Sequence, residues 1–177
     1  GHHATPESLG GTLRLSPVQV MRLVTRMESQ NLIETRGHEL HLTPEGERWA
    51  LHIVRAHRLW ERYLADEARM PLEQIHTEAH RREHNLSVAE VDALDAALGH
   101  PVRDPHGDPI PNREGKLPAE ESIELTAWWV EGPVRIVHLE DEPALAYAQI
   151  LATGLRLGQI IRLIEKSPER YVLSDGE

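Results

Sequence analysis

The first third of the chain passes from helical spacing of its apolar residues to strand spacing. Ser16 and Pro17 suit the N-cap and first position of a helix, and apolar side chains follow at helical intervals: Val20, Leu23, Val24 and Met27. Segments 32–35 and 39–42 alternate like two short strands around a glycine turn. Helix, two-stranded wing and further helix are the order of a winged helix-turn-helix, so residues 4–50 are predicted to form a partial one.

The outer face of the helix predicted from residue 17 carries three candidate DNA contacts: Gln19, Arg22 and Arg26. An ordinary solvated face explains the two arginines equally well. Ahead of this helix, residues 4–15 have no clear period and contain a Gly10-Gly11 break. The helix that precedes a reading helix is therefore expected to be missing or cut short.

A long helix is predicted after Thr43-Pro44, which form a second pair of N-cap and first-turn residues. Its buried stripe recurs at helical spacing: Trp49, Ile53, Ala56, Trp60 and Leu64. Two further helices are predicted over residues 72–85 and 88–98, the second opened by a capping box from Ser87 to Glu90. Residues 51–100 are therefore predicted to be a helical domain.

In the remainder of the chain, the composition changes first and the spacing of apolar residues changes next. Prolines and glycines crowd residues 101–120 and exclude a helix or a central strand, which predicts a linker or a long ordered loop. Beyond it the apolar period becomes two, with a short helix expected over 143–151 and a glycine-bracketed turn over 154–158. Short strands with glycine corners are typical of a small β-barrel, which is predicted for residues 121–177. The predicted fold class is thus α+β.

Two of the predicted helices carry imidazole and carboxylate donors on one face. In the helix over 72–85, four donors lie at i, i+4, i+7 and i+8: His76, His80, Glu83 and His84. His57 and Glu61 form a similar i, i+4 pair at the edge of the preceding helix's core stripe. If the two faces pack together, these nitrogen and oxygen donors form one divalent-metal site or two neighbouring ones. A solvated face would explain one such pair, but two pairs so close in sequence favour metal.

The amino-acid composition argues against several classes of function. The chain has no Cys, which excludes disulfides, thiolate ligands and thiol catalysis. No apolar run approaches the ~20 residues of a membrane span, and no secretory signal is visible. The net charge is −10, and residues 1–50 hold more Glu than Arg and no Lys, which does not favour a strong nucleic-acid binder. Gly1-His2-His3 resembles the remnant of an affinity tag, and the chain is expected to be a fragment of a longer protein.

Several ordered motifs point to a family: Leu42-Thr43-Pro44-Glu45-Gly46, His57-Arg58-Leu59 with Glu61, His76, Glu83-His84, and the run from Asp104 to Pro111. Together they resemble the diphtheria-toxin repressor family of iron- and manganese-dependent repressors, which includes the manganese-transport regulator. The resemblance implies a three-helix metal-binding and dimerisation domain behind a winged helix. It also implies two metal sites, one at His57, Glu61 and His76 and the other at His80, Glu83 and His84. The tail resembles, through its turn at 154–158, the SH3-like domain of this family and the FeoA domain of ferrous-iron transport proteins.

Three departures from the family pattern bear on the metal. The family's initial helix, with a Met or Asp ligand, has no counterpart in this sequence. His80 stands where the iron branch has a thiolate and the manganese branch a Glu, and three-histidine sites suit Zn, Fe, Co or Ni at least as well as Mn. The family's barrel-domain ligands align near Pro143 and Ala146, which offer no side-chain donor. Two other groups of donors are interpreted as turns, the second of them a solvated acidic turn: Asp104, His106 and Asp108, and Glu140, Asp141 and Glu142.

The function that the resemblance implies first is a metal-responsive transcriptional repressor, a homodimer that binds duplex operator DNA when metal selects the competent state. The alternative is a cytosolic metal-sensing module of an ABC-permease-type metal transporter, without DNA binding, because Trp60 and the run 104–111 look similar to such fusions. The His-Glu-x-x-His order of zinc hydrolases is absent, so neither an enzyme nor a small-molecule substrate is expected. The predicted location is the cytoplasm, or the cytoplasmic face of the membrane for a transporter fragment.

Overall fold

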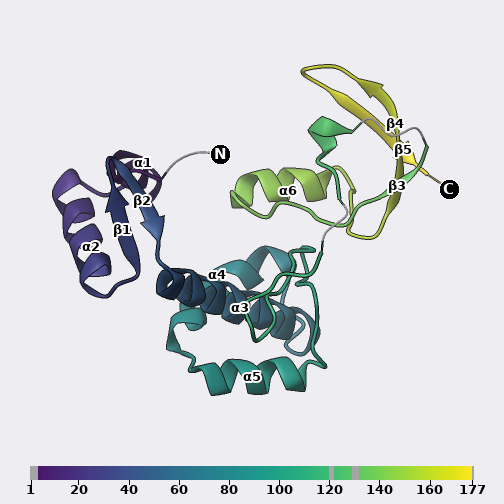
Figure 1. Ribbon diagram of the computed structural model, residues 1–177. Helices are drawn as coiled ribbons and strands as arrows, with labels where there is room; N and C mark the ends of the chain where they lie inside the picture. Colours follow the sequence, from purple (N-terminus) through teal and green to yellow (C-terminus); the bar gives the residue numbers. More distant parts are fainter. Residues whose placement is uncertain (1–3, 120–121, 129–131, 177) are drawn as a thin grey trace. The chain divides into compact units, whose positions relative to one another are not determined.

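The computed structural model describes residues 4–119, 122–128 and 132–176, so the tag-like Gly1-His2-His3 lies outside the described residues. The chain divides into two compact units, Gly1–Val54 and Arg55–Glu177. Figure 1 shows the elements of each unit in chain order. No helix among the described residues combines the length and the apolar character that a membrane crossing requires.

The first unit contains the predicted winged-helix order. Helices α1 (Pro6–Leu13) and α2 (Pro17–Ser29) precede strands β1 (Ile33–Arg36) and β2 (Glu39–Leu42). The strands pair antiparallel from Ile33 opposite Leu42 to Arg36 opposite Glu39. One apolar cluster joins α2 to both strands: Val20, Val24, Ile33 and Leu40, with Leu9, Leu15 and Met27 packed against it. This cluster fixes which face of α2 is exposed.

A short helix, α1, occupies the segment for which the sequence showed no clear period. Thr5 caps it, because its side chain accepts a hydrogen bond from the Ser8 backbone N–H while the Ser8 hydroxyl faces the Thr5 backbone N–H. Leu9 then packs against the cluster beneath α2. The helix preceding α2 is therefore cut short at eight residues rather than missing.

Three helices form the core of the region that follows the wing. Helix α3 (Pro44–Asp66) begins in the first unit and ends in the second, and it is followed by α4 (Leu72–Arg82) and α5 (Val88–Ala97). Two apolar clusters hold them together: Ala56, Leu59, Val91 and Ile110, and Leu64, Ile75 and Ala79. The predicted helix over 72–85 is partly wrong, since α4 ends at Arg82 and residues Glu83–Asn85 form a 3-10 turn. This tighter turn buries Glu83 instead of leaving it on the helix surface.

The C-terminal part contains β3 (Val134–Arg135), α6 (Ala144–Ala152), β4 (Ile160–Lys166) and β5 (Tyr171–Asp175). Helix α6 confirms the helix expected there, and the strands form an antiparallel sheet in the order β3-β4-β5. The described residues make an open sheet, so the prediction of a closed barrel is not met in them. Alternation near residue 125 gives the 3-10 turn Leu125–Ala127 rather than a strand, because the Thr126 carbonyl accepts from Lys166 Nζ instead of from a strand partner.

The corner between β1 and α3 supplies a stability prediction. A Cβ added at Gly46 would lie 1.8 Å from the Leu32 carbonyl oxygen, whereas one at Gly11 would meet nothing within 4 Å. Gly46→Ala is therefore expected to destabilise the protein by about 1–3 kcal/mol through overpacking. Gly11→Ala is expected to stabilise it by roughly 0.4–1 kcal/mol by restricting the unfolded chain. Urea denaturation followed by circular dichroism compares the two, and equal midpoints would contradict the close approach.

Candidate metal centre

Glu61 is the buried carboxylate around which the polar side chains of the second unit converge. Only 2% of it is exposed, and it lies on α3 one turn after His57. Its Oε1 atom is 3.0 Å from His57 Nε2 and 3.2 Å from His76 Nδ1, which α4 supplies. These three residues form the central cluster. The structure thus brings together the first predicted ligand set.

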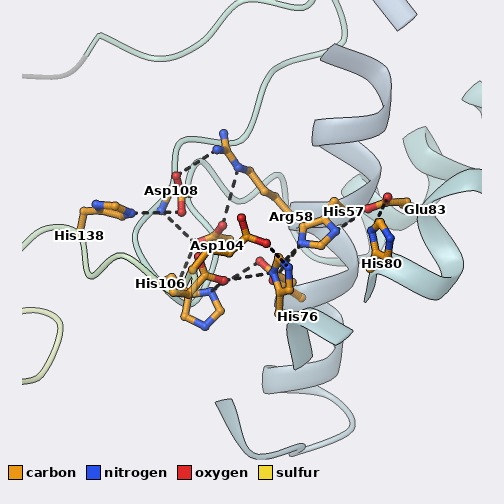
Figure 2. A network of polar contacts seen from close by, with 12 residues as sticks. His57, Arg58, His76, His80, Glu83, Asp104, His106, Asp108 and His138 are labelled. Atoms are coloured by element: carbon orange, nitrogen blue, oxygen red, sulfur yellow. Dashed lines mark hydrogen bonds and ion pairs between the residues drawn. The ribbon is translucent and has the colours of Figure 1, made fainter. Parts of the chain in front are cut away.

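His57 also faces a second group of donors, the outer cluster of His57, His80 and Glu83. Its Nδ1 atom is 2.5 Å from Glu83 Oε2, and His80 Nδ1 is 2.9 Å from Glu83 Oε1 (Figure 2). His84 Nε2 lies 3.1 Å from the same Glu83 oxygen but remains mostly exposed. The second predicted set is therefore also brought together, with the addition of His57 and with His84 at its solvent edge.

A third group, the inner cluster of Glu61, His106 and Asp141, departs from the sequence prediction. His106 Nδ1 is 3.6 Å from Glu61 Oε2 and 3.4 Å from Asp141 Oδ2. His106 is 1% exposed, yet neither of its ring nitrogens makes a hydrogen bond to any described residue. Asp141 is 13% exposed and also lies 3.1 Å from His76 Nδ1. The prediction that Asp141 belongs to a solvated acidic turn is therefore wrong. Within each of the three clusters, one donor atom per residue lies within 4.8 Å of the others.

The loop that carries His106 is held by hydrogen bonds within the loop and by hydrogen bonds from α3. Asp104 Oδ1 accepts hydrogen bonds from the backbone N–H groups of His106 and Asp108, so the predicted turn chemistry is present. Arg58, next to His57 on α3, donates to Asp108 Oδ1 at 3.0 Å (Figure 2). It also donates to the Pro109 carbonyl. The turn interpretation was thus correct for the backbone, but it missed the buried imidazole that this turn places beside Glu61.

Segment 137–141 also packs against the loop that carries His106, and this contact depends on Gly107. A Cβ on Gly107, which has a positive φ, would lie 2.1 Å from the Val137 carbonyl oxygen, so only glycine permits this approach. The Leu139 N–H donates to the His106 carbonyl at 3.0 Å, and Asp141 follows two residues later. Glu142 is mostly exposed, with its Oε1 atom 2.9 Å from His76 Nε2. The Gly in the run 104–111 was the only sequence signal for this contact.

Charge in the clusters shifts the pKa values strongly. A hydrogen bond to Asp141, followed by one to Glu61, raises the pKa of His76 to about 10. Burial alone would raise the pKa of Glu61, but its contacts with His106, His57 and His76 outweigh burial and lower it. Burial, together with the charges of Glu61 and Asp108, raises the pKa of Asp104 to about 7. The metal-free site therefore holds positive imidazolium where a cation would otherwise lie.

The predicted DNA contacts belong to the first unit, where they lie on the exposed face of α2. Arg22 and Arg26 line a shallow groove along that face, together with Val18, Met21 and Thr25. The side-chain Oε1 atom of Gln19 accepts from the Ser16 backbone N–H at 2.9 Å and from the Ser16 hydroxyl at 2.8 Å. Gln19 is thus partly committed to the capping box of α2, for which the Ser-x-x-Gln spacing of Ser16 and Gln19 is the sequence signal.

Comparison with known proteins identifies the class of this domain. Residues 43–112 match the family model described as "Iron dependent repressor, metal binding and dimerisation domain". The iron-dependent repressor IdeR of Mycobacterium leprae is 39% identical over 100 residues, which are 56% of this chain and 44% of that repressor. A solved manganese-dependent transcriptional repressor in complex with manganese aligns with a TM-score of 0.83 and 25% identity, over 99% of this chain and 87% of that one.

A third relative is of a different kind. A probable metal transport system membrane protein of Chlamydia trachomatis is 36% identical over 91 residues, which cover 49% of this chain and 19% of that protein. The fold is thus a winged helix followed by a helical domain, and residues 43–112 of it match the metal-binding and dimerisation domain of iron-dependent repressors. The chain spans less than half the length of the IdeR repressors that it matches.

The contact between His76 and Asp141 yields a pH prediction for the metal-free protein. Asp141→Asn is expected to lower the His76 pKa from about 10 towards its ordinary 6.5, because Asp141 is the largest cause of the rise. A raised histidine pKa stabilises the fold fully below 6.5, and this contribution fades as the pH rises towards 10. NMR titration of the His76 ring with chelator present measures the shift. The exposed Glu140→Gln, one residue before Asp141, serves as control, and equal His76 pKa values in wild type and Asp141→Asn would contradict the assignment.

Proposed function

We propose that this chain is a divalent-metal-sensing regulator that acts through binding rather than catalysis. The observation that carries the proposal is the row of three overlapping donor clusters, two of which share Glu61. In the inner one, the buried His106 ring has Nδ1 beside Glu61 and Asp141 at 3.6 and 3.4 Å, and its Nε2 atom has no hydrogen-bond partner among the described residues. A buried polar atom without a partner costs free energy in any protein. Such an atom is expected where the protein is built to receive another group.

The donor chemistry fits a divalent transition metal. Every donor is an imidazole nitrogen or a carboxylate oxygen, and the chain has no cysteine, which together suit Mn, Fe, Co, Ni or Zn. Glu61, Asp141 and Glu83 would supply negative charge, and His57, His76, His80 and His106 would supply nitrogen. When bound, the cation supplies the positive charge that protons provide in the metal-free protein.

We propose DNA as the partner of the first unit, with the chain acting as a homodimer. The excess of Glu over Arg in residues 1–50 had argued against DNA. In the structure, however, Arg36 pairs with Glu34 and Arg48 pairs with Glu45. Arg22 and Arg26 form no ion pair with any residue in the described ranges, so α2 presents two free cations on its exposed face. Such a face suits phosphate and base contacts in a major groove.

The likeness to the Chlamydia membrane protein favours a second candidate function. In it the same clusters sense a divalent metal as a regulatory module of a metal transporter, and α2 has no DNA partner. Metal binding is common to both candidates, so DNA binding distinguishes them.

Metal binding is tested with a double substitution that removes two donors of the outer cluster. His80→Ala with Glu83→Ala is expected to abolish binding of at least one divalent ion per chain, because the outer cluster loses two of its three donors. His38→Ala with Glu169→Ala, both exposed and outside the clusters, is the matched control and should bind like wild type. Isothermal titration calorimetry with Mn²⁺ and Zn²⁺ gives the stoichiometry, and sedimentation of the same samples gives the oligomeric state. Unchanged stoichiometry would count against the outer cluster, and monomer alone would count against the homodimer.

DNA binding is tested with the two free arginines of α2. Fluorescence anisotropy of labelled duplex at low salt should show metal-dependent binding that weakens steeply as salt rises. Arg22→Ala with Arg26→Ala is expected to weaken it at least tenfold, because two cations that face the duplex are lost. Arg162→Ala with Arg170→Ala removes the same charge from exposed positions at the C-terminal sheet and should have little effect. Absence of metal-dependent binding at low salt would remove the repressor function and leave the transporter module.

A further inference from the structure

His57 stands between two clusters and shows a different ring nitrogen to each. Its Nε2 atom lies 3.0 Å from Glu61 and 3.2 Å from His76 in the central cluster, and its Nδ1 atom lies 2.5 Å from Glu83 in the outer cluster (Figure 2). The ring is largely buried, with carboxylates on both sides. The two clusters therefore share one imidazole.

A neutral imidazole cannot serve both clusters. One ring nitrogen carries the hydrogen and the other carries the lone pair that binds a metal. When Nδ1 carries the hydrogen, it donates to Glu83, and Nε2 is a ligand for the central cluster. When Nε2 carries the hydrogen, it donates to Glu61, and Nδ1 is a ligand for the outer cluster. Each tautomer is thus stabilised by the carboxylate of the cluster that it does not serve.

Neither cluster contains a second buried imidazole that would make up for the loss of this ring. Without His57 the outer cluster keeps His80 and Glu83, and its remaining neighbour His84 is mostly exposed. The central cluster keeps Glu61 and His76, and its further neighbours are the carboxylates Asp141 and Glu142 and, on the other Glu61 oxygen, His106 of the inner cluster. The cluster that lacks His57 therefore loses one of its few nitrogen ligands.

We propose that His57 is an exclusive ligand, so that a cation in the central cluster weakens binding in the outer cluster and the reverse. The inference rests on the proposed metal binding and adds its regulation, since a chain with competing clusters fills them in sequence as metal concentration rises. Because coupling between two sites is reciprocal, each cluster must weaken the other by the same factor.

The experiment titrates Co²⁺ into the full chain by calorimetry and visible absorption. His106→Phe is used as the parent, because it removes the inner cluster while keeping a ring against Tyr147, whose centroid is 5.2 Å from that of His106. Adding His80→Ala leaves the central cluster alone, and adding His76→Ala leaves the outer cluster alone. Circular dichroism checks each variant, and Asp141→Asn replaces His106→Phe as the parent if that variant is misfolded.

The expected result is that the second binding step of the parent is about 5- to 150-fold weaker than the same cluster measured alone. In a His57→Ala parent, this difference should disappear, although both clusters bind more weakly. If the two single-cluster isotherms add up to that of the parent with His57 in place, the clusters are independent and the proposal is overturned while metal binding stands. If no variant and no wild-type sample binds Co²⁺, the proposed function fails together with the coupling.

Discussion

The second unit depends on burying the carboxylate of Glu61. An ionised carboxyl out of water is costly unless charges and hydrogen bonds compensate it, and here three imidazoles surround it. Helix α3 makes this possible because its apolar stripe and its donor stripe are offset by a single position. Leu59 and Ala56 fill the core while His57 and Glu61 lie at its edge. These neighbouring positions on α3 thus contribute both to the apolar core and to the candidate metal centre.

The groups that compensate the buried charge of Glu61 come from segments that are far apart in the sequence. Arg58 follows His57 on α3 and holds the 104–109 loop through Asp108 and Pro109. That loop places His106 against Glu61, and its Gly107 admits the segment that ends in Asp141. A change in either loop is therefore a change in the charge balance around Glu61, even though neither loop has regular secondary structure.

The helices and most of the candidate ligand set were predictable because their causes are local. Capping residues and helical spacing defined α2 and α5, and i, i+4 spacing joined His57 to Glu61 and His76 to His80. The inner cluster was not predictable, because the spacing between Glu61, His106 and Asp141 follows no helical or strand period. Asp is a residue type that favours turns as well as metal sites, so residue type alone could not distinguish the buried donor Asp141 from a solvated turn. Likewise α1 was obscured by its paired glycines, which lower helix propensity although Thr5 and Leu9 fix the helix by capping and packing.

The net charge of residues 1–50 is another feature whose effect cannot be predicted from the sequence alone. The count of Arg and Glu in residues 1–50 treats every charge alike, but charges that pair with a neighbour contribute little to the field that a partner meets. Glu34 and Glu45 are engaged with Arg36 and Arg48, whereas the two arginines of α2 have no such partner in the described ranges. These pairs leave the excess of one Glu in residues 1–50 unchanged, so the field that a partner meets at α2 depends on the position of Arg22 and Arg26 on its exposed face and not on the net charge of the unit. DNA binding by α2 is consequently a question about the position and pairing of its charges, which only the folded arrangement of side chains decides.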